Sequence, residues 1–287
     1  MHVGCGQITW RDEPEEKVLT DIAQAGYEAA VPKLTPPRSA EETLRLYATY
    51  GLVAGPPYLG AAFWDAGQRE DIVGRARSAA RFAKGLGCGE LYVAAGGSFQ
   101  AATGRSRREV AGHVGASDGL DAAQWDTLIA TLQEVGEATL EEGVRSCFHN
   151  HVGTVIETED EVERLLAATD PEVVFLGPDT GHLAWGGVDP VAFFRRHARR
   201  IRTAHLKDIS ESVRQQGVAE GWDYGTFSAE GIFEELGRGD VDLPGILEAL
   251  RSVAFDGWLV VETDVTRLPT ARESAIVSRQ HLRDLGL

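Results

Sequence analysis

Short apolar segments alternate with longer amphipathic segments along the whole chain, and this alternation constrains the fold more than any other feature. Eight apolar or β-branched runs have the length of buried strands: His2 to Gln7, Tyr27 to Pro32, Leu52 to Pro57, Glu90 to Ala95, Arg145 to His149, Val173 to Asp179, Ile201 to Lys207 and Trp258 to Glu262. Between them, apolar residues recur at helical spacing in Pro14 to Ala25, Ala40 to Tyr50, Val73 to Leu86, Ala122 to Glu142, Glu159 to Ala168, Pro190 to Arg199 and Leu243 to Val253. Repeated strand–helix units form a parallel sheet, and eight of them close into a barrel. The pattern predicts an α/β fold, a (β/α)8 TIM barrel.

The chain shows no internal repeat, linker or low-complexity tract, and its 287 residues are a usual length for one barrel. We therefore expect residues 1–287 to form one domain. Two long stretches, Gly96 to Gly119 and Ile209 to Gly239, lack regular periodicity, and each follows a strand and precedes a helix. In a barrel such loops lie at the carboxyl ends of the strands, so we expect both to border the substrate pocket.

The composition excludes several classes of function. Forty-four acidic residues against 28 basic ones give a net charge of −16, which repels phosphate backbones and anionic lipids. We therefore expect neither nucleic acid nor membrane partners. Cys5, Cys88 and Cys147 are too few and too widely spaced for a disulfide framework, so we expect them to be reduced and buried. The sequence has no signal-like start and no run of about 20 apolar residues, which predicts a cytoplasmic location.

Each of the last four predicted strands carries an ionisable residue at or near its end. These residues are His149, Asp179, His205 and Glu262. Because the strand ends of a closed barrel converge on one mouth, the four side chains can point at a common centre. A single histidine at a strand end is most often structural, but four consecutive endings of this kind favour a metal site over a structural charge network. Two imidazoles and two carboxylates suit Mn²⁺, Fe²⁺, Co²⁺ or Zn²⁺ better than Mg²⁺ or Ca²⁺.

Four further polar residues follow these strand ends. His151 shares a strand face with His149, and as a free imidazole it is the best candidate for proton transfer. His182, three residues after Asp179, is a candidate to hydrogen-bond a substrate oxygen. Lys207 is either a salt-bridge partner or a catalytic residue that contacts substrate. Asp208 is a candidate to orient a neighbouring ligand.

The strand endings resemble those of a known superfamily. His-Asn-His-Val-Gly-Thr from His149, Asp-Thr-Gly-His-Leu from Asp179, His-Leu-Lys-Asp from His205 and Val-Val-Glu ending at Glu262 are similar to motifs of the xylose isomerase-like sugar phosphate isomerases and epimerases, and within them of the inosose dehydratases. The resemblance covers essentially the whole chain and implies a Mn²⁺- or Co²⁺-dependent site. In most of the superfamily the ligand in the place of His149 is a glutamate.

Two segments depart from the dehydratase pattern. Glu28 to Lys33 lacks a second glutamate, and Thr263 to Thr266 replaces a Glu-Gln-Asp-Pro-like run. The substrate therefore stays open among small keto-cyclitols and keto-sugars.

The resemblance implies a lyase that removes an α-proton and eliminates a β-oxygen. A sugar epimerase or isomerase and a C-glycoside-cleaving eliminase of 3-keto-glycosides are the enzymatic alternatives. The chain can also be a homo-oligomer, a hetero-oligomer or a catalytically silent barrel subunit. A silent subunit is disfavoured because all four ligand positions carry ligand-type residues.

Overall fold

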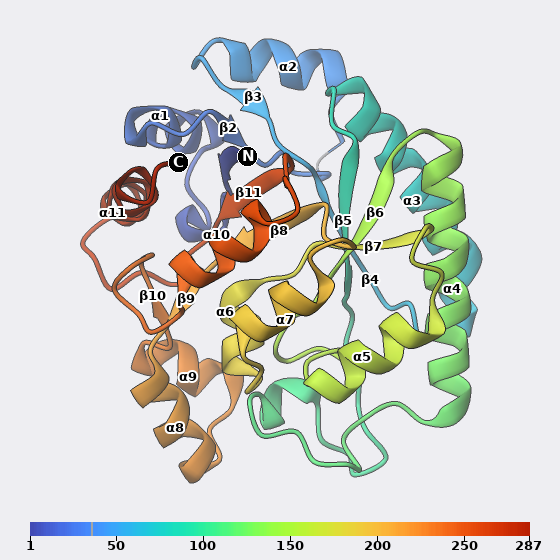
Figure 1. The fold of residues 1–287 in the computed structure, drawn as a ribbon. Coiled ribbons are helices and arrows are strands. Elements are labelled where there is room, and N and C mark those ends of the chain that lie inside the picture. The colour runs from blue at the N-terminus through green and yellow to red at the C-terminus, as the bar shows by residue number, and fades with distance from the viewer. Residues whose placement is uncertain (36) are drawn as a thin grey trace.

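The prediction of a (β/α)8 barrel is confirmed by a computed structural model, which describes residues 1–35 and 37–287. The barrel wall consists of parallel strands surrounded by helices (Figure 1). Its strands are β1 (His2–Cys5), β2 (Ala29–Ala30), β3 (Val53–Ala54), β4 (Tyr58–Ala61), β5 (Glu90–Ala95), β6 (Arg145–His149), β7 (Val174–Leu176), β8 (Thr203–Leu206) and β11 (Trp258–Val261).

The wall is assembled from two sheets. One has the order β3-β2-β1-β11-β8 and the other β4-β5-β6-β7. Parallel bridges from Leu176 to Ile201 and from Asp179 to His205 join β7 to β8. On the other side, the chain itself runs from β3 into β4 through Gly55 to Pro57. The two sheets thus form one closed wall of eight strand positions.

The helices cover the outside of this wall (Figure 1). Those that follow barrel strands are α1 (Glu15–Ala25), α2 (Ala40–Ala48), α3 (Arg69–Gly85), α4 (Ala122–Glu141), α5 (Glu159–Ala168), α6 (Thr180–Trp185), α7 (Pro190–His197), α10 (Leu243–Arg251) and α11 (Ala271–Asp284). Their apolar faces form one core with the strands, and Cys5, Cys88 and Cys147 are free and buried, as predicted. No helix among the described residues is long and apolar enough to span a membrane.

The third strand position differs from the prediction. A single strand from Leu52 to Pro57 was expected, but the structure divides this position into β3 and β4. The division falls at Pro56 and Pro57, which have no backbone N–H to donate to a neighbouring strand. As a result, among the residues that the structure describes, β3 pairs with β2 alone and β4 with β5 alone.

The prediction that Ile209 to Gly239 is irregular is wrong. The segment holds α8 (Glu211–Glu220), α9 (Tyr224–Glu230) and β10 (Phe233–Glu234), and β10 pairs antiparallel with β9 (Asp208–Ile209). The Asp208 carboxylate accepts hydrogen bonds from the backbone N–H groups of Ile209, Gly237, Gly239 and Val241. Asp208 therefore connects the two ends of this segment through backbone hydrogen bonds. The interpretation that it orients a neighbouring ligand is wrong.

Candidate metal and substrate site

The ends of β6, β7, β8 and β11 bring His149, Asp179, His205 and Glu262 together. Ligand atoms of His149, Asp179 and His205 all lie within 4.8 Å of one another. Asp179 Oδ2 is 4.0 Å from His149 Nε2 and 3.9 Å from His205 Nδ1. Glu262 lies beside this group, because its Oε2 is 3.2 Å from His205 Nδ1. These separations suit donor atoms that share one ion at about 2.0 to 2.2 Å.

Several donor atoms in this group lack other partners. Asp179 Oδ1 accepts a hydrogen bond from the backbone N–H of His182, whereas the buried Oδ2 has no hydrogen bond among the described residues. The same holds for His205 Nε2, whereas His205 Nδ1 faces Glu262 Oε2 at 3.2 Å. His149 Nδ1 lies 3.2 Å from the carbonyl oxygen of Gly177, so it donates there and leaves Nε2 with its lone pair directed at the centre. Buried acceptors left in this state fit a bound cation.

Two residues that sequence reasoning missed shape this centre. A Cβ at Gly6 would lie 2.2 Å from Glu262 Oε1, so only glycine leaves room for that carboxylate. The Tyr92 ring packs edge-on against His205, with centroids 4.3 Å apart, and its hydroxyl bonds to Thr203. An aromatic residue at an inward position of β5 gives no signal in the sequence beyond ordinary core packing.

Burial and neighbouring charges set the ionisation of these groups. Burial, with His205, His151 and Lys207 close by, holds the pKa of His149 well below its ordinary value, so its imidazole is neutral. Burial raises the pKa of Asp179. For Glu262, burial acts in the same direction, but the neighbouring His205 and Lys207 outweigh it and lower the pKa to about 2. A neutral imidazole and a carboxylate are the forms that ligate metals.

A second polar cluster adjoins the first. Lys207 Nζ lies 2.5 Å from Asp264 Oδ1, 3.4 Å from Asp179 Oδ2 and 3.7 Å from Glu262 Oε2. His182 Nε2 is 3.2 Å from the same ammonium, and the rings of His151 and His182 lie 3.7 Å apart. The sequence therefore led to His151, His182 and Lys207 correctly as neighbours of the four strand-end residues. It did not identify Asp264, which holds Lys207 in place.

The charge on Lys207 is stabilised by its surroundings. Burial disfavours an ammonium, but Asp179, Asp264 and Glu262 outweigh it and hold the pKa of Lys207 well above its ordinary value. For His151, burial and the charge of Lys207 lower the pKa to about 4. The structure therefore combines a charged Lys207 amine with a neutral His151 imidazole, and His182 contacts both.

A cavity of about 640 Å³ opens onto His151. Its lining includes Tyr58, His151 and the segment from Gly96 to Gln100, together with Arg108. The Arg108 guanidinium lies 3.8 Å above the Tyr224 ring, and Tyr224 in turn stacks near His151. Both long segments, Gly96 to Gly119 and Ile209 to Gly239, therefore border the same mouth, as the sequence predicted.

A buried carboxylate fastens the first of these segments to the second half of the barrel. Glu157 accepts hydrogen bonds of 2.7 Å from the backbone N–H groups of Gly112 and Gly153. Arg107, also buried, pairs with Glu161 at 2.6 Å and with Glu157 at 3.8 Å. Burial raises the pKa of Glu157 to about 7, although Arg107 acts in the opposite direction.

An α/β barrel with histidines and carboxylates gathered at the carboxyl ends of its strands defines a class of enzyme in which the barrel mouth holds the reactive centre. The chain belongs to the xylose isomerase-like TIM barrel family, whose model matches residues 19–285. An inosose dehydratase of Geobacillus kaustophilus is 29% identical over 274 residues, which are 92% of this chain and 87% of that protein. The rhizopine catabolism protein MocC of Rhizobium meliloti is 32% identical over 278 residues, or 92% and 82% of the two chains.

Solved structures agree with this fold. The probable 3-DHS dehydratase AsbF of Bacillus anthracis superposes with a TM-score of 0.73 at 15% identity, covering 99% of both chains. The IolI protein, whose structure holds a zinc atom, gives a TM-score of 0.72 at 15% identity over 99% of this chain and 98% of its own. The chain is therefore an enzyme of this barrel family.

Proposed function

We propose that this enzyme is a metal-dependent carbon–oxygen lyase that dehydrates a keto-cyclitol or keto-sugar, as an inosose dehydratase does. The observation that carries the proposal is the group of His149, Asp179 and His205, whose ligand atoms lie within 4.8 Å of one another, with Glu262 beside it. The relatives named inosose dehydratase, which match up to 92% of the chain, support the same reaction.

The four strand-end residues are the proposed ligands of one divalent ion. Mn²⁺ is the first candidate, and Co²⁺, Fe²⁺ and Zn²⁺ suit the same mixture of nitrogen and oxygen donors. Asp179 Oδ2, which makes no hydrogen bond among the described residues, and the lone pair at His149 Nε2 fit such an ion. When bound, it would supply Lewis acidity that stabilises negative charge on a substrate oxygen as the neighbouring proton leaves.

The residues beside the ligands carry the proposed proton transfers. His151 reaches the cavity, and its Nδ1 lies 2.6 Å from the carbonyl oxygen of Val152, so Nε2 is left to accept the α-proton. The electron pair of the broken C–H bond becomes a C=C bond, and the β-carbon loses its oxygen with its bonding pair. That oxygen takes a proton and leaves as water. Lys207 and His182 are proposed to hold and polarise the substrate oxygens, and Glu262 is a second candidate base.

The experiment is incubation of the Mn²⁺-loaded enzyme with 2-keto-myo-inositol in deuterium oxide. A product lighter by one water, a dione in its keto or enol form, supports the lyase. Exchange of one proton for deuterium with the mass otherwise retained indicates an epimerase and contradicts the proposal. Metal analysis of the purified protein accompanies the assay, since a chain that binds no divalent ion contradicts the proposed ligand set.

A further inference from the structure

The contact between β6 and β7 changes its character at the proposed metal ligand Asp179. Just before this residue, Gly177 donates its backbone N–H to the carbonyl oxygen of Phe148 at 2.9 Å, as in a parallel ladder. Two residues later, the backbone N–H of Asp179 donates to a side chain, Asn150 Oδ1, at 3.0 Å. A side chain therefore continues the contact between the two strands where the ligand leaves the barrel wall.

A second side chain makes a comparable contact on the other side of Asp179, toward β8. The backbone N–H of His205 donates to the carbonyl oxygen of Pro178 at 2.9 Å. Two residues further, the Thr180 hydroxyl accepts a hydrogen bond from the N–H of Lys207 at 2.9 Å and donates one to the carbonyl oxygen of the same residue at 2.7 Å. Thr180 thus binds both backbone polar groups of Lys207.

Both side chains act on the candidate site indirectly. Asn150 is 3% exposed and Thr180 is fully buried, and neither lines the cavity at His151. Asn150 Nδ2 makes no hydrogen bond among the described residues, so Oδ1 is the atom through which this side chain acts. After Thr180, a Cβ at Gly181 would lie 2.8 Å from Lys207 Cγ, so the start of α6 packs directly against the lysine stem.

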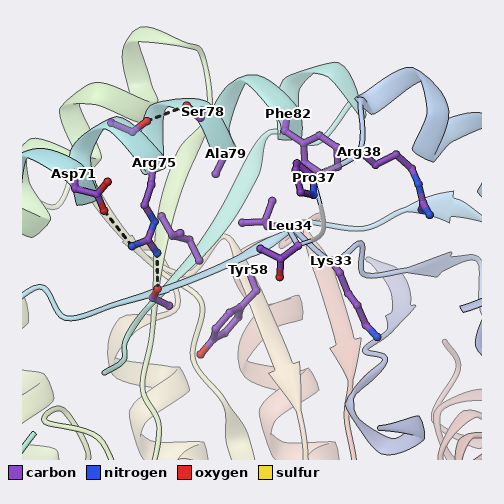
Figure 2. A pocket seen from close by; sticks show the side chains of 14 residues that line it. Lys33, Leu34, Pro37, Arg38, Tyr58, Asp71, Arg75, Ser78, Ala79 and Phe82 are labelled. Carbon is purple, nitrogen blue, oxygen red and sulfur yellow. Dashed lines mark hydrogen bonds and ion pairs between the residues drawn. The ribbon is translucent and has the colours of Figure 1, made fainter. Parts of the chain in front are cut away.

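The division between β3 and β4 offers a contrast, because a cavity remains beside it. This cavity of about 760 Å³ lies between α3, β4 and the segment after β2, and Tyr58 extends beneath it (Figure 2). Here a polar contact to the strand comes from outside the wall, since Arg75 of α3 donates to the carbonyl oxygen of Gly60 at 3.1 Å. Around Asp179 the contacts come from the strand ends themselves and are buried, which fits a role in holding the proposed ligand.

We propose that Asn150 and Thr180 are positioning residues with separate tasks. Asn150 fixes the main chain of Asp179 and thereby sets the affinity of the proposed metal site. Thr180 fixes the main chain of Lys207 and thereby sets the place of the charged amine. The inference rests on the proposed function and adds to it two residues that hold its ligand and its amine in place.

The first part of the test measures metal affinity. Asn150→Leu keeps the approximate shape of the side chain and removes the acceptor of the Asp179 N–H. Competition of the Mn²⁺-loaded protein with a chelating dye should give a Kd at least about tenfold above that of the wild type, as is usual when the support of a metal ligand is lost. Asn150→Ala removes the same acceptor without a branched side chain, and it should give the same shift.

The second part separates the amine from the metal. Thr180→Val keeps the shape of the side chain but removes the hydroxyl, so kcat for 2-keto-myo-inositol at saturating Mn²⁺ should fall about tenfold while the Mn²⁺ affinity is unchanged. Thr180→Ser retains the hydroxyl and should recover most of the activity. Thr131→Val is the matched control, because it removes a buried hydroxyl that donates to the carbonyl oxygen of Thr127 on α4, and it should change neither quantity.

Hydrogen exchange followed by NMR adds a readout that needs no substrate. The N–H of Asp179 should exchange faster in Asn150→Leu, and that of Lys207 should exchange faster in Thr180→Val. Unchanged Mn²⁺ affinity in both Asn150 variants, equal losses of affinity in Asn150→Leu and Thr180→Val, unchanged exchange, or a wild-type kcat in Thr180→Val overturns the inference.

The proposed function fails by a different result. If the wild type binds Mn²⁺ but does not dehydrate 2-keto-myo-inositol, the lyase proposal is contradicted. The Mn²⁺ affinities and the exchange of the two N–H groups then still decide whether Asn150 and Thr180 have separate tasks.

Discussion

The two halves of the barrel mouth differ in what their strands present. In the second half, His149, Asp179, His205 and Glu262 lie at or near the carboxyl ends of β6, β7, β8 and β11. In the first half, small or apolar residues take the corresponding places, such as Val31 after β2, Ala62 after β4 and Gly96 after β5. One half concentrates charge and the other leaves space, as the two cavities beside Tyr58 show. We therefore expect the proposed chemistry to depend on the second half.

Removal of a ligand from the second half should have the largest effect. His149→Ala and Asp179→Asn each remove a ligand atom from the proposed ion; in Asp179→Asn the lost atom is Oδ2, which makes no hydrogen bond among the described residues. We expect loss of bound metal and a fall in kcat/KM of at least roughly a thousandfold, since Lewis acidity supplies several kcal/mol of stabilisation. Metal content by mass spectrometry and dehydration kinetics measure both quantities.

His2→Ala is the matched control, because His2 lies at the start of β1, at the opposite end of the barrel, and is half exposed. It should keep metal and activity. Full metal content in both ligand variants would show that these residues form a structural charge network. It would contradict the proposal that the second half holds the metal.

The next effect should come from His151, which belongs to the second half but not to the proposed ligand set. His151→Ala removes the proposed base and leaves the donors of His149, Asp179 and His205 in place. We expect the metal content to be unchanged and kcat to fall at least about a hundredfold. Loss of the metal would identify His151 as a ligand and invert its assignment with His149. A near-normal kcat would move the proton transfer to Glu262 or Lys207.

The contrast between the halves also explains what the sequence could reveal. The second half was predictable because each apolar run stops at an ionisable side chain, and closure of a barrel brings such endings together. The first half carries no such marks: Tyr58 and Gly6 act through packing distances that only the folded chain defines. The prediction that residues 1–287 form one domain stays a prediction.

Other differences have specific physical causes. The division between β3 and β4 follows from the missing N–H groups of Pro56 and Pro57, so the two prolines are a sequence signal for this division. The sequence gives little signal for α8, which buries only Gly217, or for α9, which has seven residues. A helix with almost no buried face lacks the periodicity from which helices are predicted.

A pH-dependent stability difference should report on Glu157, which links the segment from Gly96 to Gly119 to the second half. Its pKa of about 7 lies above the ordinary value of 4.5. A raised carboxyl pKa gives a contribution that is complete below pH 4.5 and is lost as pH rises through 7. Between pH 5 and 8, the free energy of unfolding of the wild type should fall by about 2 kcal/mol relative to Glu157→Gln.

Urea unfolding of both proteins at several pH values measures this difference. Glu157→Gln places an amide N–H₂ near a backbone N–H and is less stable at every pH, so only the change with pH is informative. A constant difference between the two proteins from pH 5 to 8 would show that Glu157 stays ionised. Glu157 and Arg107 would then form an ion pair over this whole pH range.

The smallest expected effect concerns Asp264, which tests how tightly the second half positions its charged groups. Asp264 is the nearest carboxylate to Lys207 Nζ, at 2.5 Å, but Asp179 and Glu262 remain at 3.4 and 3.7 Å if it is removed. Asp264→Asn should therefore leave Lys207 charged but less firmly held, and kcat should fall about tenfold, as expected for loss of one hydrogen bond to a charged group. Metal content should not change, because Asp264 is outside the proposed ligand set.

Asp264→Glu restores the carboxylate and should recover most of the activity, which separates a positioning role from a general loss of packing. If Asp264→Asn matches the loss in His151→Ala, Lys207 depends on Asp264 alone and acts directly on the reacting atoms; if it has no effect, the two remaining carboxylates suffice to fix the ammonium.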